Sequence, residues 1–451
     1  MRTKLTSWFR DSSNARIAGG GLVVLAFKVL GALGGYFLLY ALASKSGPEA
    51  VGIYEVGFTA VLIGSVVGRW GFDTVIVREL GKVETVKPKG RKLYYILFTR
   101  VLLLSLFVGI VIYVSSESLT ERFFGYRDEF NIFKLSAIIV PIFAMLQFNA
   151  EAFRGLHRHM WFSLLQYGTI YMVIAVLLWV LNTNPESFYN YPGFWAYMVM
   201  ALFGLIALLL TVVSTVALHF RLHGESKAEK PARGLWPVAT AMLVSSSLFM
   251  VMSWSDTLML SYFMAEEVVG IYRIAFKIAT LITFGQFAIN TVVAPLISKI
   301  HNGERGLQSL TTKVATINLI TAGPIFLGIV VLGSWLLTLF GLEDVSAAYS
   351  WLTVLAIGQV VNAFCGPVMY LLNMTGYEKQ ARNTMFVVAA LNFVGNLVLI
   401  PLYGAMGAAM ATTSTMVMWN GWAAYLVYKY HGVIAIPGLA HRTKKKAGHE
   451  S

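Results

Sequence analysis

Long apolar segments recur along the chain, and each is long enough to form a helix that crosses a membrane. About 20 apolar residues span the hydrocarbon core of a bilayer. Short polar stretches separate twelve such segments. They lie near 17–43, 51–70, 93–115, 132–153, 161–181, 194–218, 235–262, 269–293, 314–340, 348–374, 384–402 and 405–428. The pattern predicts an all-α polytopic membrane protein with 12 transmembrane helices.

Two stretches of the chain repeat one another. Residues 49–58 (EAVGIYEVGF) are identical to residues 267–276 (EVVGIYRIAF) at six of ten positions, with an offset of 218. A weaker match relates residues 154–156 to residues 375–377, with an offset of 221. Offsets this similar indicate duplication of a six-helix unit. Because six is even, both units share one orientation, and we expect two six-helix bundles related by a pseudo-two-fold axis along the membrane normal.

Composition agrees with this architecture and excludes other classes of protein. Hydrophobic residues make up 57% of the 451 residues and charged residues only 13%, about half the share found in soluble domains. A soluble enzyme, a disordered chain and, with one cysteine, a disulfide scaffold are excluded. The predicted parts are a cytoplasmic interfacial segment (1–16), an N-terminal six-helix bundle (17–218), a cytoplasmic linker (219–234), a C-terminal six-helix bundle (235–428) and a basic cytoplasmic tail (429–451). The first apolar segment is too long for a signal-peptide core, and we expect it to be retained.

The net charge of +13 is distributed unevenly among the predicted loops. With the N-terminus inside the cell, the interior loops and tails hold 26 Lys and Arg residues and the exterior loops hold three. This asymmetry predicts that both termini are cytoplasmic. The basic residues are therefore accounted for by anionic lipid, and no nucleic-acid partner is expected. The predicted location is the cell membrane.

Five charged side chains lie within predicted membrane helices. They are Lys28, Glu55, Asp256, Arg273 and Lys277, on the first two helices of each bundle. A charge at the bilayer centre costs about 2.5–3.5 kcal/mol on insertion scales, so such residues usually face a partner or a polar cavity. These helices are natural walls for a cleft between the bundles.

Two interpretations of these charges remain open. A net positive cleft favours an anionic group such as phosphate, which predicts Lys28, Arg273 and Lys277 as ligands of a diphosphate. The other interpretation is internal pairing, of Lys28 with Asp256 and of Arg273 with Glu55. Lys277 has the fewest obvious partners. Glu55 and Arg273 occupy equivalent repeat positions, so a pair between them is a candidate exterior gate.

No catalytic or metal-binding motif is present in the sequence. There is no P-loop, nucleophile elbow, HExxH or paired-cysteine pattern. The two histidines at 157 and 159 have no acidic or cysteine cluster at ligand spacing. We therefore expect no enzyme activity, no metal and no cofactor.

Three stretches together resemble the polysaccharide-unit flippases of the multidrug/oligosaccharidyl-lipid/polysaccharide exporter superfamily. They are residues 46–54 (SGPEAVGIY), Asp256 with residues 266–272 (EEVVGIY), and residues 401–413 (PLYGAMGAAMATT). The last resembles the family's proline and glycine-rich turn into the final helix, where small residues allow close helix approach. The resemblance implies a fold of the MATE type. Twelve spans differ from the fourteen of the peptidoglycan-precursor flippases, which argues against that branch.

The resemblance also implies a function. It implies an alternating-access transporter without its own ATPase, which moves an oligosaccharide on a polyprenyl diphosphate from the cytoplasmic to the outer leaflet. The cleft cations would receive the diphosphate, and Asp256 or Glu55 would bind a coupling ion. Expected partners are the lipid-linked oligosaccharide, membrane lipid, and glycosyltransferases or a polymerase of the same pathway. We expect a monomer.

Three other functions remain open. An ion-coupled multidrug exporter of the same superfamily usually handles cations, for which a cleft dominated by carboxylates is expected. A membrane polysaccharide polymerase or ligase needs a sizeable exterior loop with catalytic residues, and none is predicted. A scaffold role without transport is the third.

Overall fold

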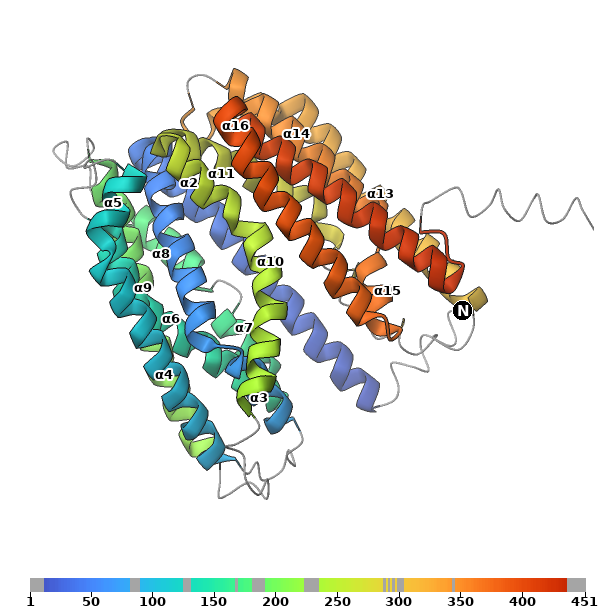
Figure 1. Ribbon diagram of the computed structural model, residues 1–451, viewed down its shortest axis with the longest axis horizontal. Helices are drawn as coiled ribbons and strands as arrows, with labels where there is room; N and C mark the ends of the chain where they lie inside the picture. Colours follow the sequence, from blue (N-terminus) through green and yellow to red (C-terminus); the bar gives the residue numbers. More distant parts are fainter. Residues whose placement is uncertain are drawn as a thin grey trace, which may run out of the picture. The chain divides into compact units, whose positions relative to one another are not determined.

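The computed structural model describes residues 12–81, 90–124, 131–166, 169–180, 191–222, 235–286, 289–290, 293, 297, 304–342 and 345–435. Every regular element in these ranges is a helix (Figure 1). Among the described residues, eight helices are long and apolar enough to cross a membrane, or nine if α7 (His159–Gln166) and α8 (Thr169–Val180) form one bent span. The prediction of an all-helical membrane protein is confirmed at this level.

Helix α2 (Ser12–Arg69) covers the first two predicted spans and changes direction between them. Ser46 and Gly47 have non-helical backbone angles, and Gly47 has a φ of 76°. A left-handed φ favours glycine because it has no Cβ. Pro48 follows at once and has no amide hydrogen to continue the helix. The sequence SGP therefore ends one span and starts the next.

The contacts among residues divide the chain into two compact units. The first consists of residues 1–250 and 265–270, and the second of residues 251–264 and 271–451. Both α10 (Leu235–Phe263) and α11 (Glu266–Thr280) contribute to both units. The bundle bounds predicted from the sequence stay a prediction. Residues 1–11, 223–234 and 436–451, which contain most of the predicted terminal segments and linker, lie outside the described residues.

Helix α6 is the centre of the first unit. It packs against α2, α4 and α9 and buries 18 of its 24 residues. Helix α4, by contrast, exposes much of one face, including Leu103, Phe107 and Ile110, as expected of a lipid-facing helix. Besides α2, this unit contains α3 (Phe72–Leu80), α4 (Arg91–Val114), α5 (Ser116–Phe124), α6 (Ile132–Gly155), α7 (His159–Gln166), α8 (Thr169–Val180) and α9 (Pro192–Arg221).

Helix α16 organises the second unit and packs against α14 and α15. It contains the last two predicted spans and breaks at Gly404, whose φ is 58° and ψ −137°. Its arms approach closely, since a Cβ added at Gly407 would lie 3.0 Å from the amide nitrogen of Ile400. The unit contains the 3-10 turn η1 (Leu281–Thr283), α13 (Glu304–Thr338), α14 (Ser346–Phe364), α15 (Val368–Met374) and α16 (Glu378–His431).

Candidate functional site

The first unit contains two of the five predicted site residues, and both lie on α2. Glu55 is only 7% exposed. It is followed one turn later by Phe58, which stacks on Tyr54 and contacts the rings of Phe143 and Phe203. Glu55 interacts electrostatically with Tyr171, whose ring also contacts Phe58 at 5.9 Å. Lys28 lies before the kink and is half-buried.

The second unit surrounds Asp256 with hydrogen-bond donors. Asp256 lies on α10 and is 2% exposed. The hydroxyl of Tyr272 donates to its Oδ2 at 2.9 Å, and the backbone amide of Thr257 donates to its Oδ1 at 2.8 Å. Tyr272 belongs to the second copy of the repeat. A buried carboxylate with two donors is an arrangement that stabilises negative charge.

Arg273 lies beside this carboxylate in the same unit. It is 6% exposed, and its guanidinium lies over the rings of Trp254 at 4.7 Å and Phe276 at 5.4 Å. Arg273 also interacts electrostatically with Asp256. Cation–π contacts and a nearby carboxylate both stabilise a buried guanidinium. Asp256 and Arg273 therefore neighbour each other within the second unit, while the pairing of Lys28 with Asp256 and of Arg273 with Glu55 stays a prediction.

Lys277 follows Arg273 by one helical turn on α11 and is half-buried. Lys28, Glu55, Arg273 and Lys277 each have at least one interaction within the protein. The structure therefore brings Asp256 and Arg273 together, and it places Lys28 and Glu55 in the other unit. A single cleft lined by all five residues, and a gate between Glu55 and Arg273, stay predictions.

A buried polar network next to Asp256 was not predicted as part of a site. Ser255 donates to Asn392 Oδ1 at 3.2 Å, and Asn392 Nδ2 donates to Thr415 at 3.1 Å. Asn396 Nδ2 donates to Asn392 Oδ1 at 3.3 Å. The network joins α10 to both arms of α16. The signal in the sequence is the spacing of Asn392 and Asn396, which lie four residues apart on an apolar helix and therefore share one face.

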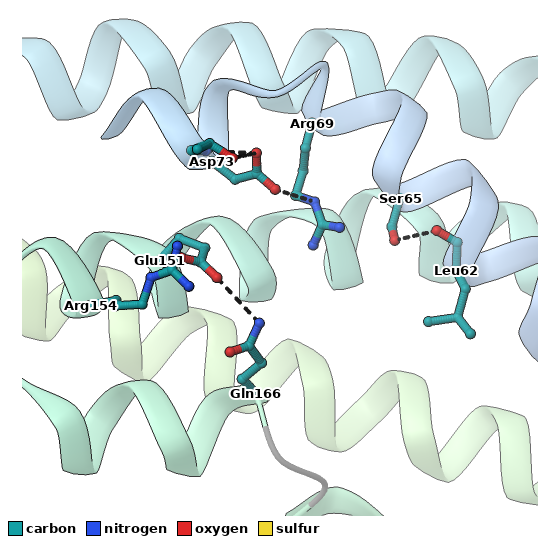
Figure 2. A network of polar contacts seen from close by, with 8 residues as sticks. Leu62, Ser65, Arg69, Asp73, Glu151, Arg154 and Gln166 are labelled. Carbon is teal, nitrogen blue, oxygen red and sulfur yellow. Dashed lines mark hydrogen bonds and ion pairs between the residues drawn. The ribbon is translucent and has the colours of Figure 1, made fainter. Parts of the chain in front are cut away.

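A second charged cluster lies in the first unit, where α2, α3, α6 and α7 meet (Figure 2). Arg69 pairs with Asp73 at 3.1 Å, and Arg154 pairs with Glu151 at 2.8 Å. Gln166 Nε2 donates to Glu151 Oε1 at 3.2 Å. Each acid has its own arginine, and the contacts connect α2 with α3 and α6 with α7. Among the described residues, no group of three His, Cys, Asp or Glu side chains is arranged to hold a metal ion.

Comparisons with known proteins assign the family. The profile of the family described as "Polysaccharide biosynthesis protein" matches residues 17–301, and the MatE profile matches residues 241–418. A probable flippase, AglR, of Haloferax volcanii is 29% identical over 37% of this chain and 36% of its own length. A probable low-salt glycan biosynthesis flippase of the same organism is 30% identical over 41% of this chain and 39% of its own length. The chain thus matches under half the length of these relatives.

Solved structures show the same fold. The lipid II flippase MurJ in an inward closed conformation has a TM-score of 0.69 at 14% identity, covering 90% of this chain and 87% of that one. An inward-facing multidrug resistance MATE family transporter has a TM-score of 0.58 at 15% identity, covering 91% and 97%. Similarity at this identity concerns the fold. The family profile, which covers more than half of the chain, shows that the chain belongs to the polysaccharide biosynthesis protein family, within the exporter superfamily that its sequence resembles.

Proposed function

We propose that this protein is a flippase that moves an oligosaccharide linked to a polyprenyl diphosphate from the cytoplasmic to the outer leaflet by alternating access. The observation that carries the proposal is the family match over residues 17–301. The names of the relatives as probable flippases, one of them for a glycan, support it. We infer a transporter without catalytic activity, whose partners are the lipid-linked glycan, membrane lipid and enzymes of the same pathway, and which acts as a monomer.

We propose twelve spans in two six-helix bundles, with both termini in the cytoplasm. Helices α2 and α16 each count as two spans, because each contains a glycine with a left-handed φ near its middle. The 26 Lys and Arg residues on the predicted interior side, against three outside, support the orientation.

We propose that Lys28 and Lys277 are the principal ligands of the diphosphate, with Arg273 as a third. The two lysines are half-buried, which suits a residue that alternates between protein and ligand. Arg273 contacts two aromatic rings and interacts with Asp256, so its charge is partly balanced within the protein. Lysine acts as a point charge toward phosphate, and arginine as a bidentate donor.

We propose that Glu55 and Asp256 bind the coupling ion or form part of the gate. Both are buried acids on membrane helices, where an unbalanced charge is costly. Binding or release of a cation at such an acid changes the stability of the conformation that buries it. Asp256 is the stronger candidate for ion coupling because its donors already hold the carboxylate in one orientation.

A second candidate function is an ion-coupled multidrug exporter, favoured by the match of the MatE profile to residues 241–418. Transport by the purified protein in proteoliposomes distinguishes the two. The proposed function predicts translocation of a fluorescent polyprenyl-diphosphate oligosaccharide above the rate of protein-free vesicles, and no uptake of a cationic dye. Dye transport without lipid translocation would support the exporter and contradict the flippase.

A further inference from the structure

The two copies of the sequence repeat contact each other through glycine backbone. A Cβ added at Gly52 on α2 would lie against the carbonyl of Glu266, 2.8 Å from its carbon, and 3.1 Å from the amide nitrogen of Gly270. A Cβ added at Gly270 on α11 would lie against the carbonyl of Pro48, 2.7 Å from its carbon, and 3.0 Å from the amide nitrogen of Gly52. All four residues belong to the first unit.

The contact follows the offset of the repeat. Adding 218 to 48 gives 266, and adding 218 to 52 gives 270. Gly52 contacts Glu266, and Gly270 contacts Pro48, so the two contacts are equivalent by the repeat. The distances on the two sides agree within 0.1 Å. A local two-fold axis therefore passes between Gly52 and Gly270. Val51 and Val269, which are equivalent by the same offset, are both fully buried beside it.

No side chain other than hydrogen fits at either glycine. The obstructing atoms are backbone, which cannot turn aside as the end of a flexible side chain can. Small residues allow helices in membranes to approach this closely, and backbone Cα–H groups then contact carbonyl oxygens. The contact is thus restricted to glycine on both helices.

The other end of the same helical segment is also held in the first unit. After Arg69, Trp70 donates from its indole nitrogen to Thr240 of α10 at 3.1 Å. A Cβ added at Gly71 would lie 2.9 Å from the amide nitrogen of Leu243, and the rings of Phe72 and Trp236 lie 4.9 Å apart. Residues 49–69 rise about 31 Å at 1.5 Å per residue, close to the ~30 Å thickness of the bilayer core. The two contacts are therefore separated by about the thickness of the bilayer core.

We propose that the contact of Gly52 with Gly270 is the seal that closes the exterior side of the protein, and that it must separate when that side opens. The inference rests on the proposed alternating access and on the orientation predicted from charge. The contact of the α2–α3 corner with α10 is the corresponding closure at the cytoplasmic side. Alanine at either glycine is then incompatible with the sealed state and favours the state open to the exterior.

Accessibility of a buried reporter tests the seal without any transport substrate. In a Cys365→Ala background, Val269→Cys is combined with Gly52→Ala, and Val51→Cys with Gly270→Ala, so that reporter and alanine lie on opposite helices. Labelling of intact cells by a membrane-impermeant maleimide is then timed. We expect each alanine to accelerate labelling about tenfold or more, the effect of a backbone clash of the usual size.

The matched control is Gly323→Ala on α13, where nothing lies within 4 Å of the added methyl group. It is expected to leave both labelling rates unchanged. Unchanged labelling in both seal variants, with normal size-exclusion profiles, would overturn the proposal. Loss of folding in both would overturn it equally, because the contact would then be required for folding rather than for one state. Faster labelling in a protein that moves no lipid would support the proposed seal and refute only the proposed function.

Discussion

Asp256 illustrates how a single charged residue is stabilised inside this protein. Its carboxylate accepts hydrogen bonds from Tyr272 and from the amide of Thr257, and Arg273 provides a balancing charge held by Trp254. Each part is needed, because a buried carboxylate without donors or a counter-charge costs several kcal/mol. Two consecutive residues of the second copy of the repeat, Tyr272 and Arg273, therefore stabilise the charge of Asp256.

The Tyr272→Phe substitution tests this arrangement. It removes the donor to Asp256 and leaves the ring, so we expect a loss of about 1.5–3 kcal/mol in stability, the usual value for a hydrogen bond to a charged group. Thermal unfolding in detergent should show a lower midpoint. Tyr425→Phe, at a tyrosine with 59% exposure on α16, is the matched control and should not change it. Equal midpoints for Tyr272→Phe and the unaltered protein would contradict the assignment.

Sequence analysis predicted which charges lie inside helices but not what contacts them. Glu55, Asp256 and Arg273 are buried, as the cost of exposing charge to lipid requires. The neighbour of Arg273 is Trp254, and Ser255 meets Asn392, 137 residues away. Such contacts depend on the packing of whole helices, for which a single sequence contains no local signal.

At the scale of elements, glycine and proline determine where the long helices turn. In α16, Gly404 takes a backbone conformation that other residues rarely adopt, and Gly407 then allows the second arm to approach Leu399 and Ile400. In α2, Gly47 and Pro48 have the same effect. The sequence predicted both turns, because proline and glycine interrupt apolar segments there.

The Gly407→Ala substitution should destabilise the protein by about 1–3 kcal/mol, the range for overpacking, since the methyl group would meet backbone of Leu399. Gly421→Ala lies on the same helix with nothing within 4 Å. It is expected to be neutral or stabilising by up to about 1 kcal/mol, because alanine favours helix. Chemical unfolding of the two variants side by side measures the difference. Equal effects would show that α16 does not depend on the close approach of its arms.

Two short helices, α3 and α5, were not predicted from the sequence. Helix α5, nine residues long, lies between two of the predicted membrane segments. The helix α3 was not predicted, although residues 72–80 place Phe72, Val75, Ile76 and Leu80 on one buried face. Both are amphipathic helices outside the apolar segments, where a search for membrane spans has no signal.

At the scale of the whole molecule, the repeat is the feature that relates sequence to mechanism. Its offset of 218 recurs in the contact of Gly52 with Gly270, where each glycine meets the residue four positions before the other. The sequence predicted the duplication but not that its two copies touch. Contact between copies requires that both segments lie at one membrane face, which an even number of spans permits.

The orientation of the chain is tested by two exposed cationic positions. In the Cys365→Ala background, Arg122→Cys on α5 and Lys379→Cys on α16 are both exposed. The charge distribution predicts the first outside the cell and the second inside. An impermeant maleimide should label Arg122→Cys in intact cells and Lys379→Cys only after permeabilisation. The reverse pattern would invert the predicted topology.

The central claim is that a flippase receives the diphosphate of its lipid substrate on lysines within the membrane helices. The most direct measurement is translocation of a polyprenyl-diphosphate oligosaccharide in proteoliposomes by the unaltered protein and by Lys28→Ala and Lys277→Ala. Lys134→Ala, at a lysine paired with Glu117 at 3.1 Å, is the control. We expect translocation by the unaltered protein and the control, and a rate about tenfold or more lower in the two variants, as for loss of a charge-assisted contact. Full rates in both variants, or no translocation by the unaltered protein, would contradict the claim.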